Sequence, residues 1–94
     1  MPDLAFLNGE ILKTKDALVP IQDRGYQFGD AVYEFVECFD AHIFCLDEHL
    51  KRLQYSMEQL DFPLISIPEI RKNIVTLFKQ SEYKRAGLYL QISR

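Results

Sequence analysis

Tyr33 and Arg52 are the side chains of this sequence best suited to bind an anionic ligand. Tyr33 follows a segment with glycines at 25 and 29, which permit positive φ and the close approach of a ligand or a second backbone. The phenol of Tyr33 can donate a hydrogen bond to a carboxylate or phosphate oxygen. The guanidinium of Arg52 is a rigid, planar fork of several donors that suits phosphate. The chemistry that these residue types indicate is therefore anion binding.

A structural interpretation competes with each of these assignments. Tyr26, Phe28 and Tyr33 would form an aromatic core cluster that closes a hairpin. Arg52 is one residue away from a stripe of leucines, so its stem would cover apolar surface while its head stays in water. Spacing alone favours the structural interpretation in both cases, and His49 is expected on the surface or at a helix end.

Composition and the remaining reactive residues exclude several classes of protein. The 94 residues carry a net charge of −3, which disfavours nonspecific nucleic-acid binding. No segment approaches the roughly 20 apolar residues of a membrane helix, and no signal peptide is recognisable, so we expect a cytoplasmic protein. Two histidines and two cysteines at unhelpful spacings make a zinc site improbable.

Cys38 and Cys45 lie in apolar runs on either side of an Asp40-Ala41 turn. A two-residue turn pairs Val36 with Cys45 and Cys38 with Ile43, and it sets the two thiols diagonally, roughly 7 Å apart. That separation discourages a disulfide, so both cysteines are expected to stay reduced and to behave as small buried apolar residues.

The elements that must position these residues follow from hydrophobic patterning. Leu46, Leu50, Leu53, Met57 and Leu60 recur at helical spacing, with Asp47 as the expected N-cap. A Ser66–Glu69 capping box opens a second helix. The expected elements are strands at 4–7 and 10–13 around Asn8-Gly9, an extended segment at 17–21, an ordered loop at 23–30, strands at 31–39 and 42–46, helices near 47–60 and 67–81, and a strand at 88–93. This order predicts an α+β fold, a small and mainly antiparallel sheet with two helices on one face.

The run Asp23–Glu34 resembles the N-terminal signature of the class IV (fold-type IV) pyridoxal-phosphate-dependent aminotransferases, especially the branch that acts on D-amino acids such as D-alanine. Glu48–Leu53 is similar to the "EH-x-x-RL" helix of that family, and Phe6–Gly9 and 88–94 match as well. The resemblance therefore covers essentially the whole chain. Ala31, where glycine is common, and Asp40-Ala41, where an Asn-Gly type of turn is usual, depart from the pattern.

The resemblance implies a role for each matching residue. Arg52 corresponds to the arginine that holds the phosphate of pyridoxal 5'-phosphate, and Tyr33 to the tyrosine that helps to hold the substrate carboxylate. Glu34 receives no chemical role. Residues 1–94 would form a single N-terminal domain, whereas the lysine that bonds to the cofactor lies in a C-terminal domain that this chain does not include. None of the lysines at 13, 15, 51, 72, 79 and 84 has the buried context that this chemistry requires.

The resemblance also implies substrates and an assembly. The substrates would be an amino acid and a 2-oxo acid, and the enzyme would be a homodimer whose active site is completed across the subunit interface. By itself the chain would be inactive. The alternatives are a branched-chain aminotransferase, a relative of 4-amino-4-deoxychorismate lyase that catalyses elimination, a non-catalytic dimerisation or regulatory module, and a fragment of a longer polypeptide.

Overall fold

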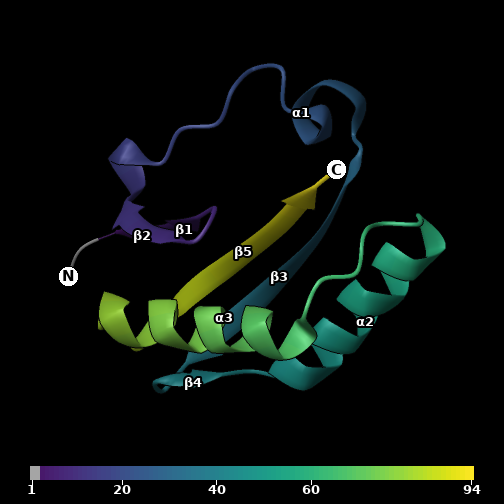
Figure 1. The fold of residues 1–94 in the computed structure, drawn as a ribbon. Coiled ribbons are helices and arrows are strands. Elements are labelled where there is room, and N and C mark those ends of the chain that lie inside the picture. Colours follow the sequence, from purple (N-terminus) through teal and green to yellow (C-terminus); the bar gives the residue numbers. More distant parts are fainter. Residues whose placement is uncertain (1–2) are drawn as a thin grey trace.

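The computed structural model describes residues 3–94. Figure 1 shows a hairpin beside a longer sheet, with two helices packed on the sheet. The elements are β1 (Leu4–Leu7), β2 (Glu10–Lys13), a 3-10 turn η1 (Thr14–Asp16), α1 (Arg24–Phe28), β3 (Ala31–Phe39), β4 (His42–Ile43), α2 (Leu46–Gln59), α3 (Ile67–Ser81) and β5 (Ala86–Ser93).

The N-terminal hairpin forms where the sequence predicts it. β1 and β2 pair antiparallel from Leu4 opposite Lys13 to Leu7 opposite Glu10. Asn8 and Gly9 turn the chain with φ of 49° and 94°, the positive values that a tight two-residue turn needs. The hairpin packs against α3, and the Tyr83 hydroxyl donates to Asp3 Oδ1 at 2.7 Å just before β1.

The main sheet has the strand order β4-β3-β5, and both of its pairings are antiparallel. Along β3, the side chains of Val32, Glu34, Val36 and Cys38 are buried, whereas the alternate side chains are exposed. The buried side chains face α2 and α3, so both helices lie on one face of the sheet (Figure 1). The predicted α+β fold is confirmed.

The core lies between this face of β3 and the two helices. Leu46, Leu50, Leu53 and Met57 of α2 are all buried, and each contributes about 1.5–3 kcal/mol through the water that it excludes. Leu60 was expected to extend the same stripe, but it is 48% exposed because α2 ends at Gln59. For α3 the predicted bounds hold, and the Ser66 hydroxyl accepts from the Glu69 backbone N–H at 3.3 Å.

The segment between β3 and α2 differs from the prediction. The strand expected at 42–46 is confined to His42–Ile43, and α2 begins at Leu46 with Cys45 as its N-cap in the left-handed conformation, at φ 54°. Cys38 does pair with Ile43, but Val36 does not pair with Cys45. Cys38 and Cys45 are free thiols; the first is buried as expected, and the second is exposed because the chain has already turned into the helix.

Asp47 therefore lies in the first turn of α2 and is not its N-cap. Its carboxylate accepts a hydrogen bond from Arg71 Nε at 2.9 Å, which links the starts of α2 and α3. An acidic side chain in a first turn still favours the helix through its dipole.

The expected loop at 23–30 contains the short helix α1. Asp23 caps it by accepting from the Gly25 backbone N–H at 2.8 Å, and Gly29 ends it at φ 64°. A Cβ at Gly25 would lie 2.5 Å from Ser93 Oγ and 3.0 Å from the Ala31 Cβ, so glycine lets α1 lie against β3 and β5. The two glycines thus serve the two purposes that their sequence context suggested, a positive φ and a close approach.

The aromatic core cluster proposed as the structural interpretation of this region is wrong. Tyr26, Phe28 and Tyr33 are 76%, 68% and 65% exposed. α1 buries none of its residues, and the alternation of β3 places Tyr33 on the face opposite the buried row that α2 and α3 cover.

Candidate functional site

A buried carboxylate lies at the centre of the candidate site. Glu34, whose side chain is 4% exposed, accepts from Arg52 through both of its oxygens, from Nε to Oε2 at 2.9 Å and from Nη2 to Oε1 at 2.7 Å. His49 Nδ1 lies 2.7 Å from the same Oε1. Two residues of one helix therefore converge on a single carboxylate of the sheet.

The elements that hold this cluster are β3 and α2. His49 and Arg52 are three residues apart, so they project from the same side of α2. They flank Leu50 and Leu53, whose burial at 3% and 0% fixes the rotation of the helix over the sheet. Glu34 lies between the buried Val32 and Val36 and therefore points from β3 toward that helix.

Each partner stabilises the charge of the other. Hydrogen bonding from Arg52, followed by that from His49, holds the pKa of Glu34 below its usual value despite the opposing effect of burial. The hydrogen bond to Glu34 and the negative charge of that carboxylate raise the pKa of Arg52 above its ordinary value. The result is an ion pair in which each group favours the charged form of the other.

Arg52 still has donors to offer a ligand. Its side chain is 67% exposed. The Nε–H and one N–H of Nη2 point to Glu34, whereas the remaining N–H groups on Nη1 and Nη2 make no hydrogen bond within residues 3–94. A guanidinium fixed along one edge and free along the other suits a phosphate or a carboxylate.

Tyr33 leaves β3 on the opposite face, where its ring stacks on Tyr89 of β5 with centroids 5.8 Å apart. Tyr33 and Arg52 therefore lie toward opposite faces of the sheet, because Arg52 contacts Glu34 and adjacent residues of a strand alternate between its faces. Tyr33 and Arg52 lie on either side of the part of β3 that precedes Cys38. In that part β5 pairs with one edge of β3, whereas β4 pairs with the other edge only from Cys38 onward.

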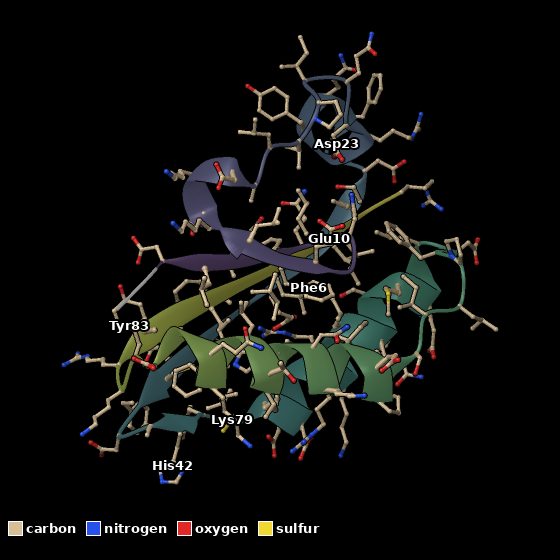
Figure 2. The ribbon with its side chains drawn as sticks, turned by 60° about the vertical axis from the view of Figure 1, so that its left-hand side comes forward. Phe6, Glu10, Asp23, His42, Lys79 and Tyr83 are labelled. Atoms are coloured by element: carbon tan, nitrogen blue, oxygen red, sulfur yellow. The ribbon has the colours of Figure 1, made fainter. Side chains whose placement is uncertain are left out.

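Two surface pockets lie away from these residues. One, of about 460 Å³, is lined by His42, Lys79 and Tyr83 among others, and the second, of about 370 Å³, lies between the start of β1 and α3. Figure 2 shows His42, Lys79 and Tyr83 toward one end of the molecule and Asp23, at the start of α1, at the other. Neither pocket includes Tyr33 or Arg52.

A second ionic network fixes α1 where it meets the end of β5. Asp30 accepts from Arg24 Nε at 2.9 Å and from Arg94 Nε at 3.0 Å, and these arginines lower its pKa. Arg94 also donates to the backbone carbonyls of Leu60 and Asp61, at 2.6 and 3.2 Å. A cation at the C-terminal end of α2 is favourable there, because it faces carbonyls that lack partners within the helix.

Other chemistries find no support within residues 3–94. All six lysines of the chain are exposed, as the sequence predicts. No three His, Cys, Asp or Glu side chains of this stretch gather as metal ligands. No helix in it is both long enough and apolar enough to cross a membrane.

The sequence interpretation missed Glu34 and His49. A signal for Glu34 was available, since it is the one acidic residue among the buried alternate positions of β3, with Val32, Val36 and Cys38. A carboxylate in such a position needs a cationic partner. His49 lies one helical turn before Leu53, but nothing local in the sequence shows that its side chain reaches the sheet.

The chain is similar in sequence and in fold to known aminotransferases. The chain is 36% identical to the D-alanine aminotransferase of Staphylococcus epidermidis over 95% of its own length, and it spans about a third of that relative, 32%. Its fold superposes on the branched-chain amino acid aminotransferase of Escherichia coli with a TM-score of 0.88 at 26% identity, covering 99% of this chain and 33% of that one. A Mycobacterium tuberculosis protein described as a hypothetical aminotransferase in its PLP-bound form gives a TM-score of 0.84 at 27% identity, covering 93% of this chain and 32% of the other. The family model for amino-transferase class IV matches residues 31–94, the stretch that holds Tyr33, Glu34, His49 and Arg52, and the chain belongs to that family.

Proposed function

We propose that residues 1–94 form the N-terminal domain of a pyridoxal-phosphate-dependent transaminase that moves an amino group between an amino acid, of D configuration, and a 2-oxo acid. The observation that carries the proposal is the Arg52 guanidinium, held along one edge by the buried Glu34 and free to donate along the other. The identity to D-alanine aminotransferases supports the choice of substrate class.

The residues present fit one part of the cofactor. The unpaired N–H groups of Arg52 suit a phosphate, which binds best to a planar, multi-donor cation. When bound, pyridoxal phosphate supplies the electron sink that amino transfer requires. Arg52 would hold the phosphate, and the hydroxyl of Tyr33 would donate to the substrate carboxylate from the opposite face of β3.

The covalent attachment of the cofactor does not fit this chain. All six lysines are exposed, so none has the buried context that imine formation with the cofactor requires. We assign that lysine to the C-terminal domain of a longer polypeptide, which acts as a cytoplasmic homodimer. The chain spans about a third of its curated relatives, which supports this assignment.

The test is the loss of phosphate recognition when Arg52 is replaced in the full-length protein. Arg52→Ala should weaken the binding of pyridoxal phosphate by about 1.5–3 kcal/mol, the value of a charge-assisted hydrogen-bonded contact. It should leave the binding of pyridoxal, which lacks the phosphate, almost unchanged. Arg52→Lys should recover only part of the loss, because an ammonium lacks the planar fork.

Arg85→Ala is the matched control, since Arg85 is also exposed and forms no ion pair within the described chain. Equilibrium titration of the apoprotein with each compound measures both affinities. If Arg52→Ala and Arg85→Ala discriminate equally well between the two compounds, Arg52 is not the phosphate anchor.

A branched-chain aminotransferase is the second candidate, because the E. coli enzyme of that description superposes on almost the whole chain. Single-turnover assays of the full-length protein with D-alanine and with L-leucine as amino donors separate the two. Transfer from D-alanine alone supports the first proposal, and transfer from L-leucine alone supports the second.

A further inference from the structure

We propose that Glu34 is a positioning residue: it holds the Arg52 guanidinium in the orientation that receives the phosphate of a ligand, and His49 braces the same carboxylate. The inference builds on the proposed function, in which Arg52 is the phosphate anchor. It gives a role to a side chain that makes no contact with the phosphate itself.

The orientation follows from which guanidinium edge is occupied. Glu34 takes the edge formed by Nε and Nη2, at 2.9 and 2.7 Å. Two parallel hydrogen bonds fix the plane of the guanidinium as well as its position. The opposite edge of the guanidinium, formed by Nη1 and the second N–H of Nη2, is thereby held in a single orientation.

Glu34 is itself fixed, which is what allows it to serve as the reference point. It is 4% exposed and lies on a paired strand between two buried valines. His49 holds Oε1 from the preceding turn of α2, at 2.7 Å, and its side chain is only 22% exposed. An exposed, flexible arginine is thus attached to a carboxylate that has little freedom to move.

Charge and geometry make opposite predictions for a change at Glu34. A carboxylate close to an anion site repels the anion, so removing its charge would by itself strengthen phosphate binding. Removing the hydrogen bonds would weaken binding, because Arg52 would have to be ordered when the ligand binds. Glu34→Asp separates the two effects, since it keeps the charge and withdraws the carboxylate by one methylene.

The experiment measures affinities of the full-length apoprotein for pyridoxal phosphate and for pyridoxal. In Glu34→Asp and Glu34→Gln, the preference for the phosphorylated compound should fall by about 2- to 10-fold, the cost of ordering one long side chain. In the double variant Glu34→Gln with Arg52→Ala, it should be no lower than in Arg52→Ala alone. Glu37→Gln is the matched control, because Glu37 lies on the exposed face of the same strand.

The outcomes separate the two proposals. An undiminished preference in Arg52→Ala would overturn the phosphate anchor and the positioning role together. A reduced preference in Arg52→Ala with a wild-type or higher preference in Glu34→Asp would overturn the positioning role alone.

A measurement on the unmodified protein covers the case in which the Glu34 variants do not fold. The Arg52 Nε–H should give an NMR signal with a rigid heteronuclear NOE, assigned by its loss in Arg52→Lys. The Nε–H of Arg85, which has no ion pair within residues 3–94, is the internal reference for a mobile side chain. An Arg52 side chain as mobile as that of Arg85 would overturn the positioning role.

Discussion

At the scale of single residues, Glu34 has two roles: it belongs to the buried row of β3, and it holds the guanidinium of Arg52. It is the charged member of the buried row along β3, and its charge is stable there because a guanidinium and an imidazole satisfy it. Breaking such a pair by removing one partner leaves an uncompensated buried charge, which is costly. The same two hydrogen bonds thus stabilise the domain and orient Arg52.

Acid should weaken the fold through Glu34. Its pKa is lowered from 4.5 in the folded chain, so between the lowered value and 4.5 the unfolded chain binds more protons. The stability from this group is therefore present above 4.5 and is lost as the pH falls through the folded pKa. As the pH falls below about 5, the free energy of unfolding should decrease more steeply in the wild type than in Glu34→Gln.

Urea unfolding at several pH values measures this difference. Asp23 and Asp30, whose pKa values are also lowered, are present in both proteins, so their effect cancels in the comparison. Parallel stability curves for the two proteins would contradict the prediction.

At the scale of elements, short connections adopt left-handed backbone to place the larger elements. Asp40 and Ala41 turn β3 into β4 at φ 51° and 61°, and Cys45 starts α2 at φ 54°. For a residue with a Cβ, the left-handed conformation costs about 1–2 kcal/mol relative to the right-handed one. The packing of β3 and α2 is strong enough to impose it at three positions that lack glycine.

Ala41→Gly should therefore stabilise the protein. The change removes the strain of a Cβ at φ 61°, and it costs the extra chain entropy of glycine, so a net gain of about 0.5–1 kcal/mol is expected. Ala86→Gly, in β5 without a positive φ, is the control and should destabilise by a similar amount. Chemical denaturation of both variants measures the changes, and destabilisation by Ala41→Gly would show that the turn is not strained.

At the scale of the whole molecule, α2 and α3 cover one face of the main sheet, whereas α1 lies against the end of the other face where Ala31 pairs with Ser93. The helices cover the row of Val32, Glu34 and Val36, whereas Tyr33 and Phe35 remain 65% and 51% exposed. The two residues assigned to ligand binding thus flank one strand on its two sides, and the rest of the proposed enzyme would have to complete the site around them.

This arrangement predicts how the 94-residue chain behaves with the cofactor. Mixed with pyridoxal phosphate and reduced with borohydride, it should show no stoichiometric adduct at a single lysine, because all six lysines are exposed and none has the buried context that favours imine formation. Peptide mass analysis, with the urea-unfolded chain as the control, measures labelling at each lysine. A lysine labelled selectively and stoichiometrically in the folded chain alone would contradict the assignment of the covalent step to another domain.

Most of the fold was predictable from sequence because its signals are local. The Asn8-Gly9 turn, the leucine stripe of α2 and the Ser66 cap of α3 each depend on residues a few positions apart. The start of α2 at Leu46 was not predictable in this way, because Asp47 is an equally good cap by local criteria. The left-handed turn at Cys45 follows from where β3 and the core place the chain.

By itself, the sequence determined most of the elements, the face of α2 and of α3 that is buried, and the family to which the chain belongs, because periodicity and motifs are properties of neighbouring residues. The tertiary structure alone decided that Arg52 and His49 meet Glu34, which lies 18 and 15 residues before them in the chain. It also decided that Tyr33 lies on the other face of β3. These are relations between a strand and a helix, and the packing of the leucine stripe against the sheet sets them.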